Sequence, residues 1–183
     1  MTQTERPAVR VLALSAQDAQ RYRALMLEAY DQAPDAFTST VQERAVEPLD
    51  WWAQRITPAS GLSQVLGAFV GQQLVGTVAL EYASKPKTRH WAQVIGMYVQ
   101  PGYRGLGLGA LLMQAAVTAA SEHPEVCAMR LTVTEGNEAA VRLYQSVGFR
   151  AWGVEPLAMR TATGYKGKVH MSMQLPQVQA TSA

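Results

Sequence analysis

Three glycines alternate with leucines in the run Arg104-Gly105-Leu106-Gly107-Leu108-Gly109. Residues 91–99 before this run have the composition of a β-strand, and residues 110–121 after it that of an apolar helix. Glycines between a strand and a helix let several backbone N–H groups point toward one place, because no Cβ atoms intervene. The helix dipole adds roughly half a positive charge there, and Arg104 adds a full one. The spacing therefore predicts a loop that binds phosphate, with a purely structural glycine turn as the alternative.

The residues after the glycines narrow the choice of phosphate ligand. A Walker-type loop needs Lys followed by Ser or Thr, whereas Gly109 is followed by Ala110 and Leu111, so phosphoryl transfer is disfavoured. Gly105, Gly107 and Ala110 do match the dinucleotide fingerprint G-x-G-x-x-A. However, residues 100–104 lengthen the turn, and no acidic residue ends a second strand at the expected distance. A nicotinamide or flavin enzyme is therefore a weaker alternative.

The rest of the chain predicts a mixed sheet. The pattern of apolar residues indicates strands at 9–14, 64–70, 73–82, 91–99, 126–134, 149–154 and 168–175, and helices from Ser15 through Glu28, at 41–55 with an interruption at Pro48, at 110–121 and at 137–147. Hairpins give antiparallel neighbours and strand–helix–strand units give parallel ones. We expect an α/β (α+β) fold with about seven strands and about four helices on both faces. Residues 1–176 form one domain in this interpretation, and residues 177–183 a flexible tail.

Composition argues against several classes of partner. A net charge of +2, with Lys and Arg scattered along the chain, does not favour nucleic acid or a membrane surface. One cysteine, Cys127, cannot form an internal disulfide, and the three histidines lack the spacing of metal ligands. We therefore expect no metal. The absence of an apolar leader or a long apolar run predicts a cytoplasmic protein.

Two blocks of residues resemble the GNAT acetyltransferase superfamily. Residues 104–109 match its acyl-CoA-binding pattern Arg/Gln-x-x-Gly-x-Gly/Ala, after the Met97-Tyr98-Val99-x-Pro101 that often precedes it. Asn137, Ala140, Leu143-Tyr144 and Gly148-Phe149 match the pattern N-x-x-A-x-x-L-Y-x-x-x-G-F. The resemblance implies the GNAT fold and acetyl-CoA as the acyl donor.

The resemblance also implies roles for residues of these blocks. Backbone groups of Met97, Tyr98 and Val99 would pair with pantetheine as an added strand. The pyrophosphate would lie on the glycine loop, which comprises Arg104, Gly105, Leu106, Gly107, Leu108, Gly109 and Ala110. Asn137 would contact the amide portion of the cofactor, or would only cap the helix that it begins.

Tyr144 is the candidate catalytic acid. It lies two helical turns after Asn137, so the two residues share one helix face. A tyrosine at this position in the family protonates the departing CoA thiolate, and packing in the core is the alternative role. The attacking amine must be neutral, and for the base we choose Glu81, with Glu135 second; a solvated surface carboxylate is the alternative for both.

The acceptor site would be built from the segments that resemble the family least. We expect it to include Phe37 in the loop 34–40, Trp52 in the helix that carries Trp51-Trp52, and the late loop 155–167. Relatives often have an Asp-Glu pair where this chain has Gly167-Lys168, which favours an acidic or neutral acceptor.

The sequence therefore predicts an N-acetyltransferase that moves an acetyl group from acetyl-CoA to a primary amine of a small molecule or protein, by direct attack in a ternary complex. A homodimer is possible on the same resemblance. The alternative is a non-catalytic module that binds acyl-CoA as a sensor.

Overall fold

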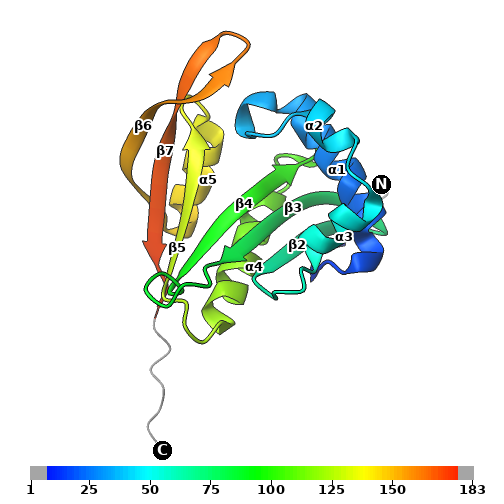
Figure 1. Cartoon of the computed structure of the whole chain (residues 1–183), viewed down its shortest axis with the longest axis horizontal. Helices are drawn as coiled ribbons and strands as arrows, with labels where there is room; N and C mark the ends of the chain where they lie inside the picture. Colours follow the sequence, from blue (N-terminus) through cyan, green and yellow to red (C-terminus); the bar gives the residue numbers. More distant parts are fainter. Residues whose placement is uncertain (1–7, 177–183) are drawn as a thin grey trace, which may run out of the picture.

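A computed structural model describes residues 8–176 of the chain, and the predicted tail at 177–183 lies outside them. The strands are β1 (Val9–Ala13), β2 (Ser63–Val70), β3 (Gln73–Tyr82), β4 (Trp91–Val99), β5 (Ala128–Thr134), β6 (Arg150–Thr161) and β7 (Gly164–Gln174). They form one seven-stranded sheet in the order β1-β2-β3-β4-β5-β7-β6, in which only β4 and β5 are parallel (Figure 1). The predicted mixed sheet is confirmed.

Within residues 8–176, five α-helices and three short 3-10 segments connect the strands. They are α1 (Ala19–Gln32), α2 (Val41–Ala45), α3 (Leu49–Ile56), α4 (Leu108–Glu122) and α5 (Glu138–Val147), with η1 (Ala16–Asp18), η2 (Pro34–Ala36) and η3 (Pro101–Tyr103). The side chains of Ser15 and Asp18 form a capping box where the first helical segment begins, as the N-cap prediction requires. Pro48 separates α2 from α3, because a proline cannot continue the hydrogen bonding of a helix.

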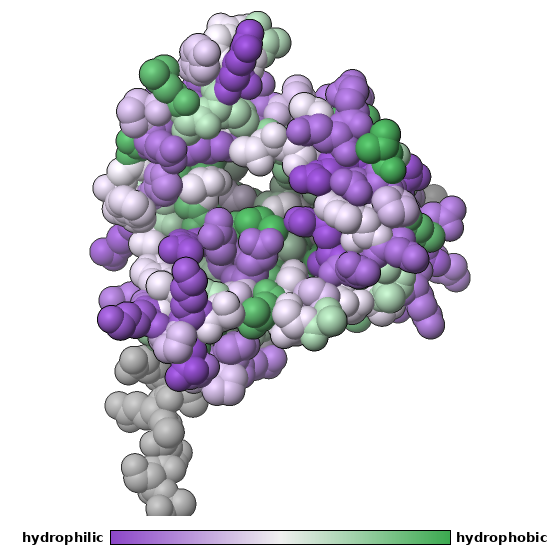
Figure 2. Space-filling view, in the orientation of Figure 1, coloured by the Kyte–Doolittle hydropathy of each residue, from purple (hydrophilic) through white to green (hydrophobic). Residues whose placement is uncertain are grey.

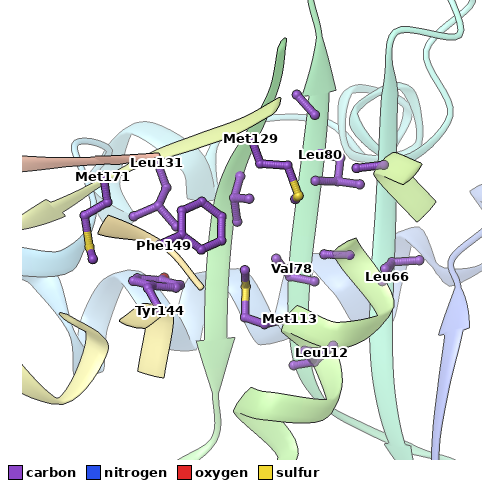
Figure 3. Packing of buried hydrophobic residues seen from close by; sticks show 14 of the residues in the cluster. Leu66, Val78, Leu80, Leu112, Met113, Met129, Leu131, Tyr144, Phe149 and Met171 are labelled. Carbon is purple, nitrogen blue, oxygen red and sulfur yellow. The ribbon is translucent and has the colours of Figure 1, made fainter. Parts of the chain in front are cut away.

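The sheet carries a separate hydrophobic core on each face. One core joins the sheet to α4 and α5 and includes Leu112, Met129 and Phe149, all with 1% or less of their surface exposed (Figure 3). The other core joins β2, β3 and β4 to α1 and α3. Helices on both faces confirm the predicted layers.

Trp52 belongs to the second core, which corrects its predicted place in the acceptor site. None of its surface is exposed, and its ring packs edge-on against Tyr22 at 5.9 Å between centroids. Its neighbour Trp51 is partly buried and lies under the guanidinium groups of Arg44 and Arg55. Adjacent residues of a helix point in different directions, and here both side chains pack among α1, α2 and α3. Neither tryptophan lines the cavities that adjoin β4.

The predicted late loop 155–167 is also corrected, because most of it is β-structure. Strands β6 and β7 form a hairpin that continues to the pair Thr161 and Gly164, with an irregularity between Glu155 and Met159 where Leu157 has a φ of 53°. The hairpin extends beyond the rest of the sheet as an arm (Figure 1). Arg160, Tyr165 and Lys166 lie on this arm, and their polarity concealed the alternation that a strand shows.

The parallel strands β4 and β5 pair over only three positions and then separate. Trp91, Ala92 and Gln93 pair with Ala128, Met129 and Arg130, and beyond Gln93 the edge of β4 that faces β5 pairs with no strand of residues 8–176. The register of β4 against β3 shifts between Tyr98 and Ile95, where Gly96 has a φ of 60°. A bulge of this kind bends a strand and increases its twist, so Gly96 contributes to opening a V-shaped gap in the sheet.

We expect Gly96→Ala to lower the free energy of unfolding by about 1 kcal/mol, because an L-residue with a Cβ is strained at this φ. The added Cβ would meet no atom closer than 3.9 Å, so the loss would come from backbone conformation and not from a clash. Urea denaturation measures this loss in the free energy of unfolding. Gly102→Ala is the matched control, since Gly102 has an ordinary φ and open space around it. Equal midpoints for the two variants would contradict the role given to Gly96.

Candidate active site

The gap between β4 and β5 holds two adjoining cavities of about 250 and 540 Å³. Both are lined by Phe37, Met97, Asn137, Ala140 and Leu143, so they form one continuous cleft. Figure 2 shows the molecule hollowed between the β6–β7 arm and the region of α1 and α2, with apolar surface in the hollow. The sequence-predicted residues can be placed against this cleft one group at a time.

The glycine loop lines the larger cavity at its outer end. Gly105 and Gly107 have φ values of 76° and 81°, and Gly107 is the N-cap of α4. The backbone N–H groups of residues 105–110 donate to no acceptor in the described part of the chain. Unpaired amides at a helix N-terminus bind anions, so the loop has the geometry that a pyrophosphate requires.

Arg104 lies beside this loop with part of its guanidinium already engaged. Its Nε donates a hydrogen bond to the Val99 carbonyl at 3.0 Å, and the group lies 5.7 Å from the Tyr98 ring centroid. The remaining N–H groups of an arginine fork can still pair with phosphate oxygens. Arg104 therefore links the end of β4 to the glycine loop.

The β4 segment predicted to pair with the cofactor forms one wall of the cleft. Met97, Tyr98 and Val99 line the larger cavity. The Tyr98 hydroxyl donates to Glu28 at 3.0 Å, and Gln100 donates to the same carboxylate at 2.6 Å, so α1 holds the end of β4 in place. The free edge of β4 is available for an added strand.

Asn137 lines both cavities and also caps a helix. Its Oδ1 accepts a hydrogen bond from the Ala140 amide at 3.2 Å at the start of α5. The capping role is therefore present in the structure, and contact with a cofactor remains a prediction for the side-chain NH₂.

Tyr144 projects from α5 into the smaller cavity. Its ring packs edge-on against Phe149 at 6.0 Å, and 7% of the residue is exposed (Figure 3). The hydroxyl makes no hydrogen bond to any residue between 8 and 176. Burial raises the pKa of Tyr144 to about 12, so the phenol keeps its proton at neutral pH. The site therefore contains an unengaged O–H donor.

Glu81, the predicted base, is not brought into the same cavity as Tyr144. It lies exposed near the end of β3 and lines a neighbouring cavity of about 320 Å³ with Tyr22 and Arg55. Ile95 lines both this cavity and the one that contains Tyr144. The role of Glu81 stays a prediction. Glu135, the second choice, is exposed after β5 and lines neither cavity of the cleft.

Phe37, the predicted acceptor residue, lines both cavities of the cleft, and the smaller cavity is also lined by one residue that sequence reasoning did not select. Phe37 is half-buried against Tyr30, with ring centroids 5.2 Å apart. Lys168 is buried and lines the smaller cavity with Tyr144. The only sequence signal for Lys168 was its departure from the acidic pair of relatives.

Residues 8–176 contain no cluster of three or more His, Cys, Asp or Glu side chains suited to a metal ion. Within the same residues, none of the helices has the length and apolarity needed to cross a membrane.

Comparison with known proteins gives consistent matches. The sequence profile of the acetyltransferase (GNAT) family matches residues 26–149. An L-amino acid N-acetyltransferase of Escherichia coli K12 is 25% identical over 121 residues, which are 66% of this chain and 72% of that protein.

Solved structures share the fold. A putative acetyltransferase from Salmonella typhimurium, solved with its cofactor acetyl-CoA, superposes with a TM-score of 0.76 at 19% identity, covering 96% of this chain and 99% of that one. A GNAT-family acetyltransferase from Streptococcus pneumoniae gives 0.77 at 20% identity, covering 92% and 100%.

The raised pKa of Tyr144 predicts a loss of stability at high pH. Between the unfolded pKa of about 10 and the folded pKa of about 12, the unfolded state has released a proton that the folded state keeps. The free energy of unfolding contributed by this group is therefore intact below pH 10 and falls by about 1.4 kcal/mol per pH unit above it.

Urea denaturation at pH 9, 10 and 11 tests this, with Tyr144→Phe as the comparison. The variant should lose less stability per pH unit than the wild type. Tyr22 has a similarly raised pKa and stays in both proteins, so the difference between them isolates Tyr144. Parallel pH profiles would show that Tyr144 titrates normally.

Proposed function

The chain belongs to the acetyltransferase (GNAT) family and transfers an acetyl group to an amine, and we propose that the donor is acetyl-CoA bound between the open edge of β4 and the glycine loop. One observation carries the proposal. The unpaired edge of β4, the free amides of residues 105–110 and the Tyr144 hydroxyl all lie along one continuous cleft. A pantetheine chain with a pyrophosphate at one end and a thioester at the other matches this order of groups.

Different residues along the cleft bind different parts of the donor. Backbone groups of Met97 to Val99 hold the pantetheine in line, and the loop amides with Arg104 hold the pyrophosphate. Acetyl-CoA supplies an acetyl thioester, whose C–S bond breaks as the acceptor nitrogen forms a C–N bond. The apolar lining of Val94, Leu131 and Val133 excludes water from the smaller cavity, which limits hydrolysis of the thioester.

Tyr144 acts on the sulfur in this proposal. A phenol of pKa about 12 is a weaker acid than a thiol of reference pKa about 8.5, so full transfer of its proton is unfavourable without help from the site. A hydrogen bond from the hydroxyl to the sulfur stabilises negative charge while the C–S bond breaks. The proton lost by the acceptor nitrogen balances the one that the thiolate gains.

Tyr144 lies on the face of the sheet that α4 and α5 cover, and the acceptor reaches the thioester from the other face, which α1 and α3 cover. Tyr144 comes from α5, whereas Phe37 lines the same cavity from the side of α1. Relatives named for L-amino acids and for a ribosomal-protein alanine both act on an amine. The alternative of a non-catalytic sensor has no support, because the family and these relatives are acetyltransferases.

Binding of the donor is tested by thermal unfolding with acetyl-CoA, CoA, NAD and ATP. A ligand at 100 times its Kd adds about 2.7 kcal/mol to stability, so we expect acetyl-CoA and CoA to raise Tm by about 5 °C or more. Gly107→Trp should abolish this shift, since a side chain there enters the larger cavity. The control Gly71→Trp places the same residue at a similar φ in the β2–β3 turn and should keep the shift. A shift with NAD or ATP alone would refute the assignment.

Tyr144→Phe should lower kcat by about 100-fold while the affinity for acetyl-CoA stays within about threefold. Thiol release with an acceptor amine measures kcat, and calorimetry measures binding. Tyr82→Phe removes the hydroxyl of another buried tyrosine, on the α4 face at the closed end of the gap, and should leave kcat unchanged. Loss of binding in parallel with kcat would show that Tyr144 packs against the donor and does not act on the sulfur.

A further inference from the structure

Lys168 lies on the acceptor side of the cleft. It pairs with Thr134 across β7 and β5, while the neighbouring Val169 and Met171 pack with the α4 and α5 core. Successive strand residues point to opposite faces, so Lys168 points away from that core, toward η2. Only 8% of its surface is exposed. A lysine buried to this extent needs a polar partner.

The Lys168 ammonium donates only one hydrogen bond within residues 8–176. Its Nζ donates to the Thr134 hydroxyl at 2.8 Å, and that hydroxyl donates onward to the Asp35 carbonyl. Of the nearby carboxylates, Asp35 pairs with Lys166 at 2.6 Å and Glu155 lies 3.2 Å from the His170 ring nitrogen, while Glu135, beside Gly167, forms no ion pair with any residue between 8 and 176. Lys168 forms no ion pair with any residue in the range 8–176. Its ammonium therefore has N–H groups left for a ligand.

The lining of the two cavities shows which part of the cleft Lys168 faces. Lys168 lines the smaller cavity together with Tyr144, and it does not line the larger cavity of the glycine loop. It thus faces the place where the acceptor amine meets the thioester, away from the pyrophosphate. Among residues 8–176, no carboxylate side chain lines this cavity. A cation here repels an acceptor with positive charges only, and attracts one that also carries a negative group.

We propose that Lys168 Nζ binds a carboxylate of the acceptor, so that the preferred substrates are amines that carry a carboxylate close to the reacting nitrogen, as α-amino acids do. This inference rests on the proposed acetyl transfer and specifies its substrate class. Thr134 orients the ammonium by accepting one of its hydrogen bonds, and the Asp35 carbonyl orients Thr134. The substrate carboxylate completes the ion pair that the protein itself leaves open.

Burial lowers the pKa of Lys168, although Glu155 acts in the opposite direction. A bound carboxylate favours the charged form and would raise the pKa of Lys168 again. Polyamines offer no such group, which makes them poor acceptors in this site.

The test compares wild-type enzyme, Lys168→Met and the control Lys87→Met in a thiol-release assay with acetyl-CoA. The acceptors are L-amino acids, the carboxamide of each, and spermidine. Lys87 is an exposed lysine in the loop between β3 and β4, at the closed end of the gap, so its loss changes net charge equally without touching the cleft. We expect Lys168→Met to raise KM for amino acids by about 10- to 100-fold, with kcat and the KM for carboxamides nearly unchanged. Lys87→Met should match the wild type.

A binding measurement supplies a second readout that needs no turnover. With CoA present, an N-acetyl-L-amino acid should raise the Tm of wild-type protein more than its carboxamide does, and Lys168→Met should remove this difference while keeping the shift with acetyl-CoA. If Lys168→Met does not fold, the wild-type enzyme alone tests the proposal. A lower KM for amino acids than for their carboxamides and spermidine supports the carboxylate site.

Several results would overturn the proposal. Equal loss of kcat with acids and amides in Lys168→Met would make Lys168 part of the chemistry and not an anion site. Acetylation of Lys168 itself, found by mass spectrometry, would make it an acceptor. A wild-type enzyme that prefers carboxamides or spermidine would refute the carboxylate site alone, whereas the absence of a thermal shift with acetyl-CoA and CoA would refute the proposed function.

Discussion

The structure depends on a backbone that is left without a partner where β4 and β5 separate. A sheet normally pairs the N–H and C=O groups of its interior strands, and an unpaired polar backbone group away from water is costly. Here the parallel ladder stops at Gln93, in the middle of the sheet, and Gly96 bends β4 away from its neighbour. The site follows from this geometry, because the open edge offers main-chain hydrogen bonds to an extended ligand and the gap connects the two faces of the molecule.

Contacts from distant parts of the chain hold the walls of this gap in position. Glu28 on α1 accepts hydrogen bonds from Tyr98 and Gln100 at the end of β4. On the opposite wall, Thr134 at the end of β5 donates to the Asp35 carbonyl in η2, and Lys168 donates to Thr134. The N-terminal helices therefore do more than cover a core. They form hydrogen bonds to both walls of the gap, and Phe37, which follows η2, lines both of its cavities.

The sequence predicted most of the fold and the position of the glycine loop before α4, because those features have local signals. The limits of β3 and β4, the interruption at Pro48 and the glycine turn before α4 each follow from residues adjacent in the chain. The acceptor half depends on contacts between remote segments, and here prediction failed or was incomplete. Trp52 lies in the core, residues 155–167 continue mostly as strands, and Lys168 lines the smaller cavity together with Ala36 of η2. Glu81 is predicted from its residue type and its place at the end of a strand, and no local pattern indicates which cavity it lines.

The short pairing between β4 and β5 leaves the two halves of the sheet joined by few main-chain hydrogen bonds. Strands β1–β4 and strands β5–β7 are each continuous in sequence and antiparallel within themselves, and only three residue pairs join them through the sheet. A ligand that bonds to the edge of β4 and contacts α5 across the gap lengthens this seam. In the proposed binding mode, acetyl-CoA would add hydrogen bonds between the two halves of the sheet and so raise the cooperativity with which they unfold.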